Sequence, residues 1–221
     1  MSNSLTAELN RKGLLEMQLG RVDPMGLRDR LIVAQQLFLE ALNISREEPV
    51  SLFNLGLVQY YLENPEAKAS FEEARTVSEQ KGSKETLVNS TYMLAVTQKQ
   101  AGEYENAFAN ALQALDLANG EDYDCLILLS GIGLSTTEFV TAEEFARRAC
   151  RANDDEGDGH YNLACALEGQ GRIEEAVKSL ERAFQCKSSL RELAFGDIER
   201  GKEPDRDVSK SAVIIRQKEL S

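Results

Sequence analysis

The stretch YNLACALEGQGRIEEAVKSLERAF, at residues 161–184, decides the fold of this 221-residue chain. Two amphipathic runs lie on either side of a short segment that contains two glycines. Ala164, Ala176 and Ala183 stand at positions where such a helix usually carries bulkier side chains. Because alanine combines high helix propensity with little bulk, we expect it to let two helices approach closely. The stretch therefore predicts a pair of packed helices joined by a tight turn.

The same pattern occurs three times in succession, in segments that begin at Thr91, Leu126 and His160. Each segment has an apolar stretch, a turn and then an alanine three positions after an aromatic or branched residue. A second alanine follows seven residues later, and Gly102 and Gly171 stand in two of the turns. The first alanines are Ala107, Ala142 and Ala176, spaced by 35 and 34 residues, and the second are Ala114, Ala149 and Ala183.

Two earlier segments follow the pattern more loosely. One carries Ala67, Phe71 and Ala74, and the other carries Ala34, Phe38 and Ala41. With a period of about 34 residues and one helix–turn–helix per repeat, the chain resembles the tetratricopeptide repeat family. The resemblance implies an all-α, right-handed superhelical solenoid of antiparallel helix pairs. One pair cannot bury its apolar face alone, so stacked pairs share a continuous core and the ends need polar caps.

The resemblance also implies a domain organisation. We expect a helical repeat domain at residues 1–195, with five repeats at approximately 5–45, 49–80, 88–121, 123–156 and 157–190. Residues 196–221 are expected to form a charged linker and a C-terminal capping helix or tail, because Gly196, Gly201 and Pro204 interrupt helical periodicity there. The apolar C-terminal segment AVIIRQKEL could also dock in the groove of its own or another copy.

Composition limits the class of partner and the compartment. The 25 basic and 37 acidic residues give a net charge of −12, which disfavours nucleic acids and anionic membrane surfaces. The start, MSNSLTAELNRK, has no apolar signal region, and the run CLILLSGIGL is too short to span a bilayer. We therefore expect a cytoplasmic protein in which Cys125, Cys150, Cys165 and Cys186 are reduced.

No stretch predicts an enzyme, a cofactor or a metal site. His160 is the only histidine and lacks the partners that triad or zinc chemistry needs, so a packed histidine is the better interpretation. Gly131 and Gly133 begin a dinucleotide-like spacing, but Thr136 stands where the third glycine belongs. The acidic stretches NDDEGD and NGEDYD lack the calcium-loop spacing and are expected to be solvated turns.

The first helices of tetratricopeptide repeats line a concave surface that receives a partner segment. The resemblance places on that surface four of the six tyrosines, a residue type well suited to binding because it joins apolar area to a hydroxyl group. The implied groove residues are Phe53, Asn54, Leu57, Tyr60, Tyr61, Tyr92, Met93, Val96, Lys99, Ile127, Leu128, Gly131, Leu134, Tyr161, Asn162 and Cys165.

One subtype of the family grips acidic chaperone tails with two lysines, an arginine and two asparagines. The matching positions here are Asn10 and Leu14, then Asn54, then Asn89 and Met93, so only Asn54 agrees. Without the cations a buried carboxylate would be unpaired, which disfavours that ligand. The sequence instead predicts a non-enzymatic adaptor or scaffold for an apolar or amphipathic protein segment, with a basic flank attracted by the acidic chain. A dedicated chaperone, as in bacterial secretion systems, or a homo-oligomer are the alternatives.

Overall fold

The structure is a computed structural model and describes residues 2–199 and 209–219. It divides into an N-terminal unit (residues 1–117) and a C-terminal unit (residues 118–221). The helices of the N-terminal unit are α1 (Ser2–Val22), α2 (Leu27–Ile44), α3 (Pro49–Tyr61), α4 (Ala67–Lys81), α5 (Lys84–Gln100) and α6 (Tyr104–Leu117). Those of the C-terminal unit are α7 (Tyr123–Ser135), α8 (Phe139–Ala152), α9 (Gly157–Gly169), α10 (Ile173–Cys186), α11 (Ser189–Glu199) and α12 (Ser209–Glu219). Within the described ranges no residue is in a β-strand.

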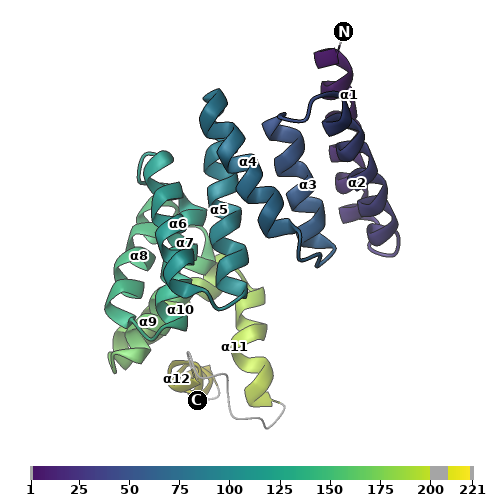
Figure 1. Cartoon of the computed structure of the whole chain (residues 1–221). Helices are drawn as coiled ribbons and strands as arrows, with labels where there is room; N and C mark the ends of the chain where they lie inside the picture. Colours follow the sequence, from purple (N-terminus) through teal and green to yellow (C-terminus); the bar gives the residue numbers. More distant parts are fainter. Residues whose placement is uncertain (1, 200–208, 220–221) are drawn as a thin grey trace. The chain divides into compact units, whose positions relative to one another are not determined.

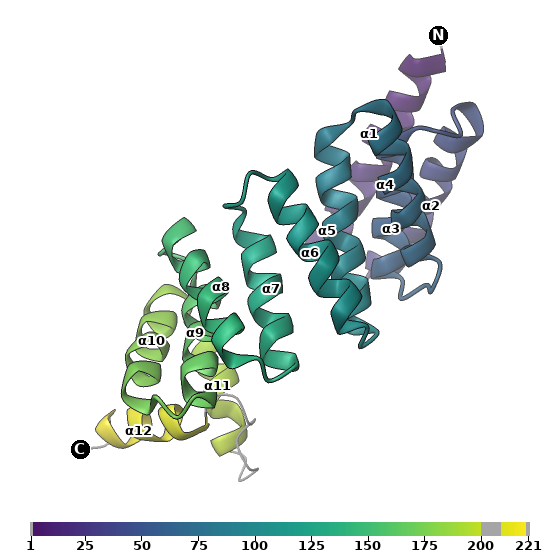
Figure 2. The same cartoon turned by 60° about the vertical axis from the view of Figure 1, so that its left-hand side comes forward.

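Each unit is a stack of helix pairs. In the N-terminal unit α1 packs on α2, α3 on α4 and α5 on α6, while α2 meets α3 and α4 meets α5 (Figure 1). In the C-terminal unit α7 packs on α8 and α9 on α10, and α8 meets α9 (Figure 2). Chain neighbours are therefore also neighbours in space, as the short turns of the sequence require.

The alanines that define the repeat lie where the helices meet. The second helix of each of the five pairs carries two alanines seven residues apart, and none of them is more than 4% exposed. Their small size lets the backbones approach, so that larger side chains of neighbouring helices fill the remaining space. These residues are Ala34, Ala41, Ala67, Ala74, Ala107, Ala114, Ala142, Ala149, Ala176 and Ala183.

In the first two pairs a phenylalanine of the second helix fits against a glycine of the first. A Cβ atom at Gly13 would lie 2.6 Å from the ring of Phe38, and one at Gly56 would lie 2.7 Å from the ring of Phe71. Both rings are fully buried. Glycine is therefore required at these two positions by close packing and not by backbone conformation.

Four turns within helix pairs share one backbone geometry. Each contains a residue with a left-handed backbone, and the next amide donates to a carbonyl five residues earlier at 2.8 to 2.9 Å. This closure satisfies carbonyls at the end of the first helix. The left-handed residues are Glu63 (φ 57°), Gly102 (φ 76°), Thr137 (φ 61°) and Gly171 (φ 78°).

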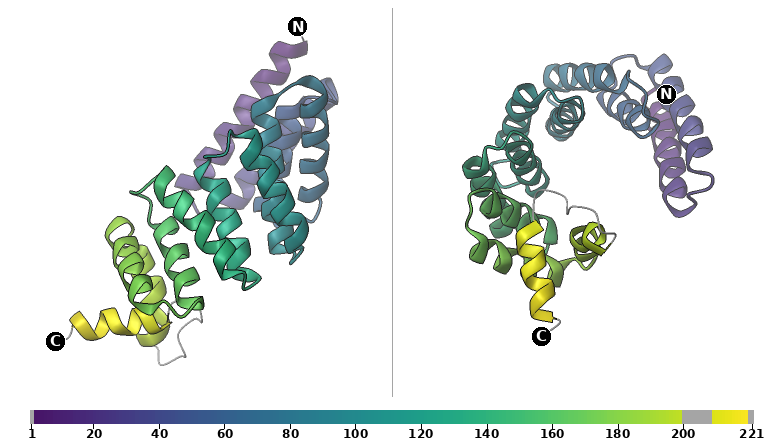
Figure 3. Two further views of the ribbon diagram at one scale, coloured as in Figure 1. Left: turned by 90° about the vertical axis from the view of Figure 1, so that its left-hand side faces the viewer. Right: turned by 90° about the horizontal axis from the view of Figure 1, so that it is seen from below.

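The two last helices cover the α9–α10 pair. Ala212 and Ile215 of α12 are buried in one cluster with Phe195 of α11 and with residues of α9 and α10. In Figures 2 and 3, α12 runs crosswise over one end of α9 and α10. The Glu168 carboxylate holds the first turn of α12 by accepting from the backbone amides of Lys210 (2.8 Å) and Ser211 (3.1 Å). The parts of the expected linker and tail at residues 200–208 and 220–221 lie outside the described residues.

Candidate partner-binding surface

The expected groove positions of the N-terminal unit come from two neighbouring first helices, α3 and α5, which contact each other. On α3 they recur with helical spacing, so they share one side of the helix. Phe53, Leu57, Tyr60 and Met93 are half-buried and pack against a buried cluster made by Ala67, Phe71 and Leu94. Tyr61 is the most exposed member at 48%. Of the remaining members, Tyr92, Val96 and Lys99 are half-buried and Asn54 is buried.

A cavity of about 670 Å³ opens at the C-terminal ends of α3 and α5. Tyr60 and Tyr61 line it with their rings edge to face, at a centroid distance of 5.6 Å. The Gln100 side-chain amide donates to the Tyr60 hydroxyl at 2.6 Å, and the Arg21 guanidinium donates weakly to the Tyr61 hydroxyl at 3.5 Å. These contacts hold both rings while leaving part of each available to a ligand.

Several residues that line this cavity were not among the expected groove residues. Most of them come after the first helix, where the spacing of that helix does not predict the surface that α3 forms with α5. The turn between α3 and α4 brings Asn64 and Pro65 to the cavity, the first turn of α4 brings Lys68, and Thr97 of α5 completes the wall. Lys68 is held by the Glu103 carboxylate at 2.8 Å, so its charge is already paired.

Within the described part of the chain, two hydrogen-bond donors among the expected residues have no partner atom. The ammonium group of half-buried Lys99 makes no hydrogen bond or ion pair with any described residue. Burial lowers the pKa of Lys99, because the charged form is desolvated without a nearby carboxylate. The side-chain nitrogen of Asn54, which is 4% exposed, also lacks a partner there. Lys99 is thus a cation on this face that remains available to a hydrogen-bond acceptor.

The expected groove positions of the C-terminal unit are covered to a greater extent by their own chain. Leu134 and Tyr161 pack against the cluster that α9 to α12 form, and Cys165 is a member of that cluster. Asn162 donates weakly to the Ile127 carbonyl at 3.4 Å. Ile127, Gly131 and Asn162 are half-buried.

Three expected groove residues lie in contacts between helices. Asn54, Leu128 and Cys165 are 4%, 7% and 2% exposed, so the structure offers almost none of their surface to a partner. All three stand next to, or one turn away from, positions that are half-buried. Helical spacing places such neighbours on one side of a helix, but it does not distinguish the contact with the next pair from the solvent-facing edge.

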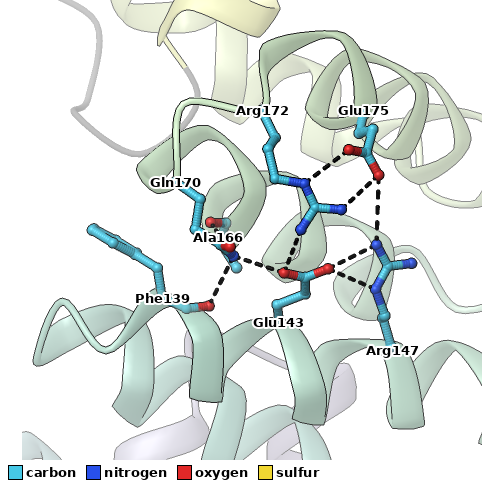
Figure 4. Close-up of polar contacts among 7 residues, drawn as sticks. All are labelled: Phe139, Glu143, Arg147, Ala166, Gln170, Arg172 and Glu175. Atoms are coloured by element: carbon cyan, nitrogen blue, oxygen red, sulfur yellow. Dashed lines mark hydrogen bonds and ion pairs between the residues drawn. The ribbon is translucent and has the colours of Figure 1, made fainter.

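A charged network joins the turn between α9 and α10 to α8 (Figure 4). The Glu143 carboxylate, whose side chain is 14% exposed, accepts from Arg172 at 2.7 Å, Gln170 at 2.7 Å and Arg147 at 2.8 Å. Arg172 also pairs with Glu175 at 2.7 Å. Burial by itself would raise the pKa of Glu143, but these hydrogen bonds outweigh it and hold the pKa below its ordinary value. Each charge has a partner, so the network is suited to fixing the helices rather than to binding a ligand.

The single histidine is packed, as its sequence context predicts. His160 is 8% exposed, and its Nε2 lies 3.1 Å from the Asp154 carbonyl oxygen and 3.2 Å from an Asp154 carboxylate oxygen. Its Nδ1 lies 3.5 Å from the Cys150 sulfur. Burial, with the nearby Asp154 carboxylate, raises the pKa of Cys150 to about 11. A thiol with that pKa is protonated near neutral pH, which makes it a poor nucleophile.

Two other kinds of feature are absent from residues 2–199 and 209–219. None of their helices is long and apolar enough to cross a lipid bilayer. Among the same residues no three His, Cys, Asp or Glu side chains are grouped so that they could hold a metal ion.

The fold defines an all-α solenoid built from antiparallel helix pairs, which is the predicted class of fold. Residues 158–187 match the sequence profile of the family described as Tetratricopeptide repeat. The expected resemblance to that family is confirmed for this segment by sequence, and the other helix pairs share the predicted fold. A comparison with curated protein sequences found no match.

Solved structures with the same fold cover most of the chain. PilF of Pseudomonas aeruginosa is 15% identical with a TM-score of 0.72, over 99% of this chain and 93% of that one. MamA of Desulfovibrio magneticus RS-1 is 15% identical with a TM-score of 0.64, over 80% of this chain and 96% of that one. YrrB is 16% identical with a TM-score of 0.60, over 85% of this chain and 93% of that one. At such identities the likeness concerns the fold alone.

Proposed function

We propose that this chain is a non-enzymatic protein-interaction module, an adaptor or scaffold, that binds an extended or helical segment of a partner on the α3–α5 face. The observation that carries the proposal is the set of half-covered aromatic and aliphatic side chains there, beside an open cavity of about 670 Å³. The structure of YrrB is described as that of a tetratricopeptide repeat protein with an unusual peptide-binding site, which supports this class of ligand.

The chemistry of the face defines the segment that would fit. Tyr60 and Tyr61 present large rings whose positions are already restrained, so that binding an apolar side chain costs little additional ordering. Lys99 would pair with a carbonyl or carboxylate oxygen of the segment, which would recover the cost of its partial desolvation. The net charge of −12 would favour a basic flank beyond the contact.

The C-terminal unit contributes less to the proposed surface. Its half-buried positions Ile127, Gly131 and Asn162 stay as proposed secondary contacts. Tyr161 and Leu134 already pack against the cluster of their own unit, so replacing either residue would also disturb the fold. Variants in the N-terminal unit therefore provide the cleaner test.

The test uses a display library of random peptides, selected on the full chain and then titrated by calorimetry. We expect enriched peptides to carry large apolar residues, and Tyr61→Ala to weaken their binding at least tenfold. Tyr61 is 48% exposed, so this variant should fold normally. Val140→Ala, at a residue that is 73% exposed on α8, is the matched control and should leave binding unchanged. The proposal would be refuted if the library yielded no binding peptide, or if the selected peptides bound the Tyr61→Ala and Tyr60→Ala variants as tightly as wild type.

A further inference from the structure

Helix α1 carries a second stripe, apolar at four of its six positions, on the side that faces away from its own unit. The buried side of α1 is formed by Thr6, Leu9, Gly13, Met17 and Gly20. The second stripe is entirely exposed and alternates steps of three and four residues, the spacing of a coiled-coil seam. We call it the outer seam, and it consists of Leu5, Glu8, Lys12, Leu15, Leu19 and Val22.

Nothing in the described N-terminal unit covers the outer seam. Among the described helices α1 contacts only α2 and α3, and Asn10 on its buried side donates to Glu48, just before α3. The seam residues Leu5 and Leu15 are 49% and 47% exposed. In the described residues, 11 of the 16 exposed large apolar side chains fall within residues 5–44. The end of a solenoid usually has a polar outer face that keeps it apart from other molecules, whereas this end also exposes leucine side chains.

We propose that the first four positions of the outer seam, from Leu5 to Leu15, pair with the same four positions of a second copy of this chain, with the two α1 helices antiparallel about a two-fold axis near residue 10. This register places Leu5 opposite Leu15 of the other copy, and Glu8 opposite its Lys12. The axis repeats both contacts, because a two-fold interface uses the same patch on each subunit. The seam has two kinds of position, with Leu5 and Lys12 of one kind and Glu8 and Leu15 of the other. In this register each contact joins one position of each kind, as in antiparallel helix pairs.

The order of charges selects both the partner and the direction. Glu8 and Lys12 already form an ion pair at 2.8 Å along the helix, with their side chains about half exposed. Antiparallel pairing brings each of them beside an opposite charge of the other copy, so that four charges alternate in sign. A parallel pair would place Glu8 beside Glu8 and Lys12 beside Lys12, which is unfavourable. The seam from Leu5 to Leu15 is therefore complementary to itself: a second copy places a leucine opposite each leucine and an opposite charge opposite each charge.

Sedimentation velocity of the full chain over a hundredfold range of concentration tests the pairing. We expect wild-type chains to dimerise, and E8K or K12E alone to raise the dimer dissociation constant at least tenfold, because like charges then meet across the axis. The double variant E8K/K12E restores opposite charges and should recover the dimer. All these positions are exposed, so circular dichroism should show unchanged helix content. A wild-type chain that is monomeric throughout, or a dimer insensitive to either single variant, would overturn the proposal.

Disulfide trapping tests the register separately. Chains with L5C mixed with chains with L15C should form a covalent dimer on oxidation, whereas each variant alone should not. A parallel pair would instead link each variant to itself. Unmodified chains are the control for the four native cysteines, of which Cys125 and Cys165 are buried. Linkage within a single variant, or none in the mixture, would contradict the antiparallel register.

Discussion

At the scale of the residue, the first two helix pairs depend on a match between a large and a small side chain. Phe71 lies over Gly56, and Phe38 lies over Gly13, with no space for an added methyl group. In the fifth pair a small and a larger side chain, Ala164 and Leu180, are likewise both fully buried in one cluster. Protein interiors are close-packed, so these matches cannot be changed one partner at a time.

Gly56→Ala should lower the free energy of unfolding by about 2 kcal/mol, because its Cβ atom would lie 2.7 Å from the Phe71 ring, which is fully buried. Urea unfolding followed by circular dichroism measures the loss. Adding Phe71→Leu to Gly56→Ala should make the double variant more stable than the sum of the two separate losses predicts. Strictly additive losses would show that the two residues do not interact.

Thr137→Gly should raise the free energy of unfolding by about 1 kcal/mol, because a β-branched residue has a φ of 61° there and glycine removes the strain. Gly171 occupies the equivalent turn of the next pair, with a φ of 78° and open space where a Cβ atom would lie. Gly171→Ala is therefore the matched opposite, and it should destabilise by a similar amount. Thermal unfolding compares the two variants, and an increase in stability for both would contradict the strain argument.

At the scale of the element, two carboxylates connect helices through hydrogen bonds and ion pairs, in addition to the packing of their apolar side chains. Glu143 of α8 holds the turn that leads into α10, and Glu168 of α9 holds the first turn of α12. Both act across elements, because their partners outside their own helix are 27 to 43 residues away in the chain. Such contacts link the helices of the C-terminal unit in addition to their shared apolar cluster.

Glu143→Gln should lower the free energy of unfolding by about 2 kcal/mol at neutral pH, because it removes charge-assisted hydrogen bonds at a mostly buried site. The pKa of Glu143 lies below its ordinary value of 4.5, so its contribution is complete above that value and is lost as pH falls through the lowered pKa. The difference between variant and wild type should therefore shrink on acidification. Urea unfolding at neutral and acidic pH measures it.

The control for this network is Glu175→Gln. Glu175 contacts the same Arg172, but its side chain is 50% exposed, so its ion pair is screened by water and contributes less. We expect a smaller loss than for Glu143→Gln. Equal losses would mean that burial is not what gives Glu143 its importance.

Glu168→Ala should loosen α12 without unfolding the α9–α10 pair, because it removes the acceptor of two backbone amides at the start of α12. The loss of such a cap costs about 1 kcal/mol. Hydrogen exchange should become faster in residues 209–219. Glu181→Ala, which removes only the exposed pair with Lys218, should leave that exchange nearly unchanged. Equal protection in wild type and Glu168→Ala would show that the apolar contacts alone hold α12.

At the scale of the whole molecule, an acidic chain presents two uncovered apolar surfaces that we assign to different partners. The α3–α5 face is proposed to bind another protein, and the outer seam of α1 is proposed to bind a second copy. The two surfaces share no residue, and Arg21, the α1 residue that reaches Tyr61, is not part of the seam. Both surfaces are in the N-terminal unit.

The two proposed activities should therefore be separable. The E8K variant, monomeric by expectation, should bind a library-selected peptide with an affinity within about twofold of wild type, because no seam residue lines the cavity. Tyr61→Ala should conversely dimerise like wild type. Calorimetry and sedimentation on both variants test this independence. A parallel loss of peptide binding and dimerisation in either variant would show that the two surfaces are coupled.

The sequence by itself determined the repeat, the helix pairs and the small residues at their contacts. Those features depend on helix propensity and on spacing within about 34 residues, and both are local properties of the chain. It also indicated the turns, two of them marked by Gly102 and Gly171, but not the left-handed backbone of Glu63 and Thr137, which these residue types disfavour.

Only the tertiary structure decided which of the expected groove residues remain exposed. Tyr61 is half exposed whereas Cys165 is buried, although both follow from the same repeat spacing. The difference arises because burial is set by the neighbouring helix, and α11 and α12 cover the α9–α10 pair from far along the chain. The exposed seam of α1 has the same origin, since a helix at the end of a stack has a neighbour on one side only.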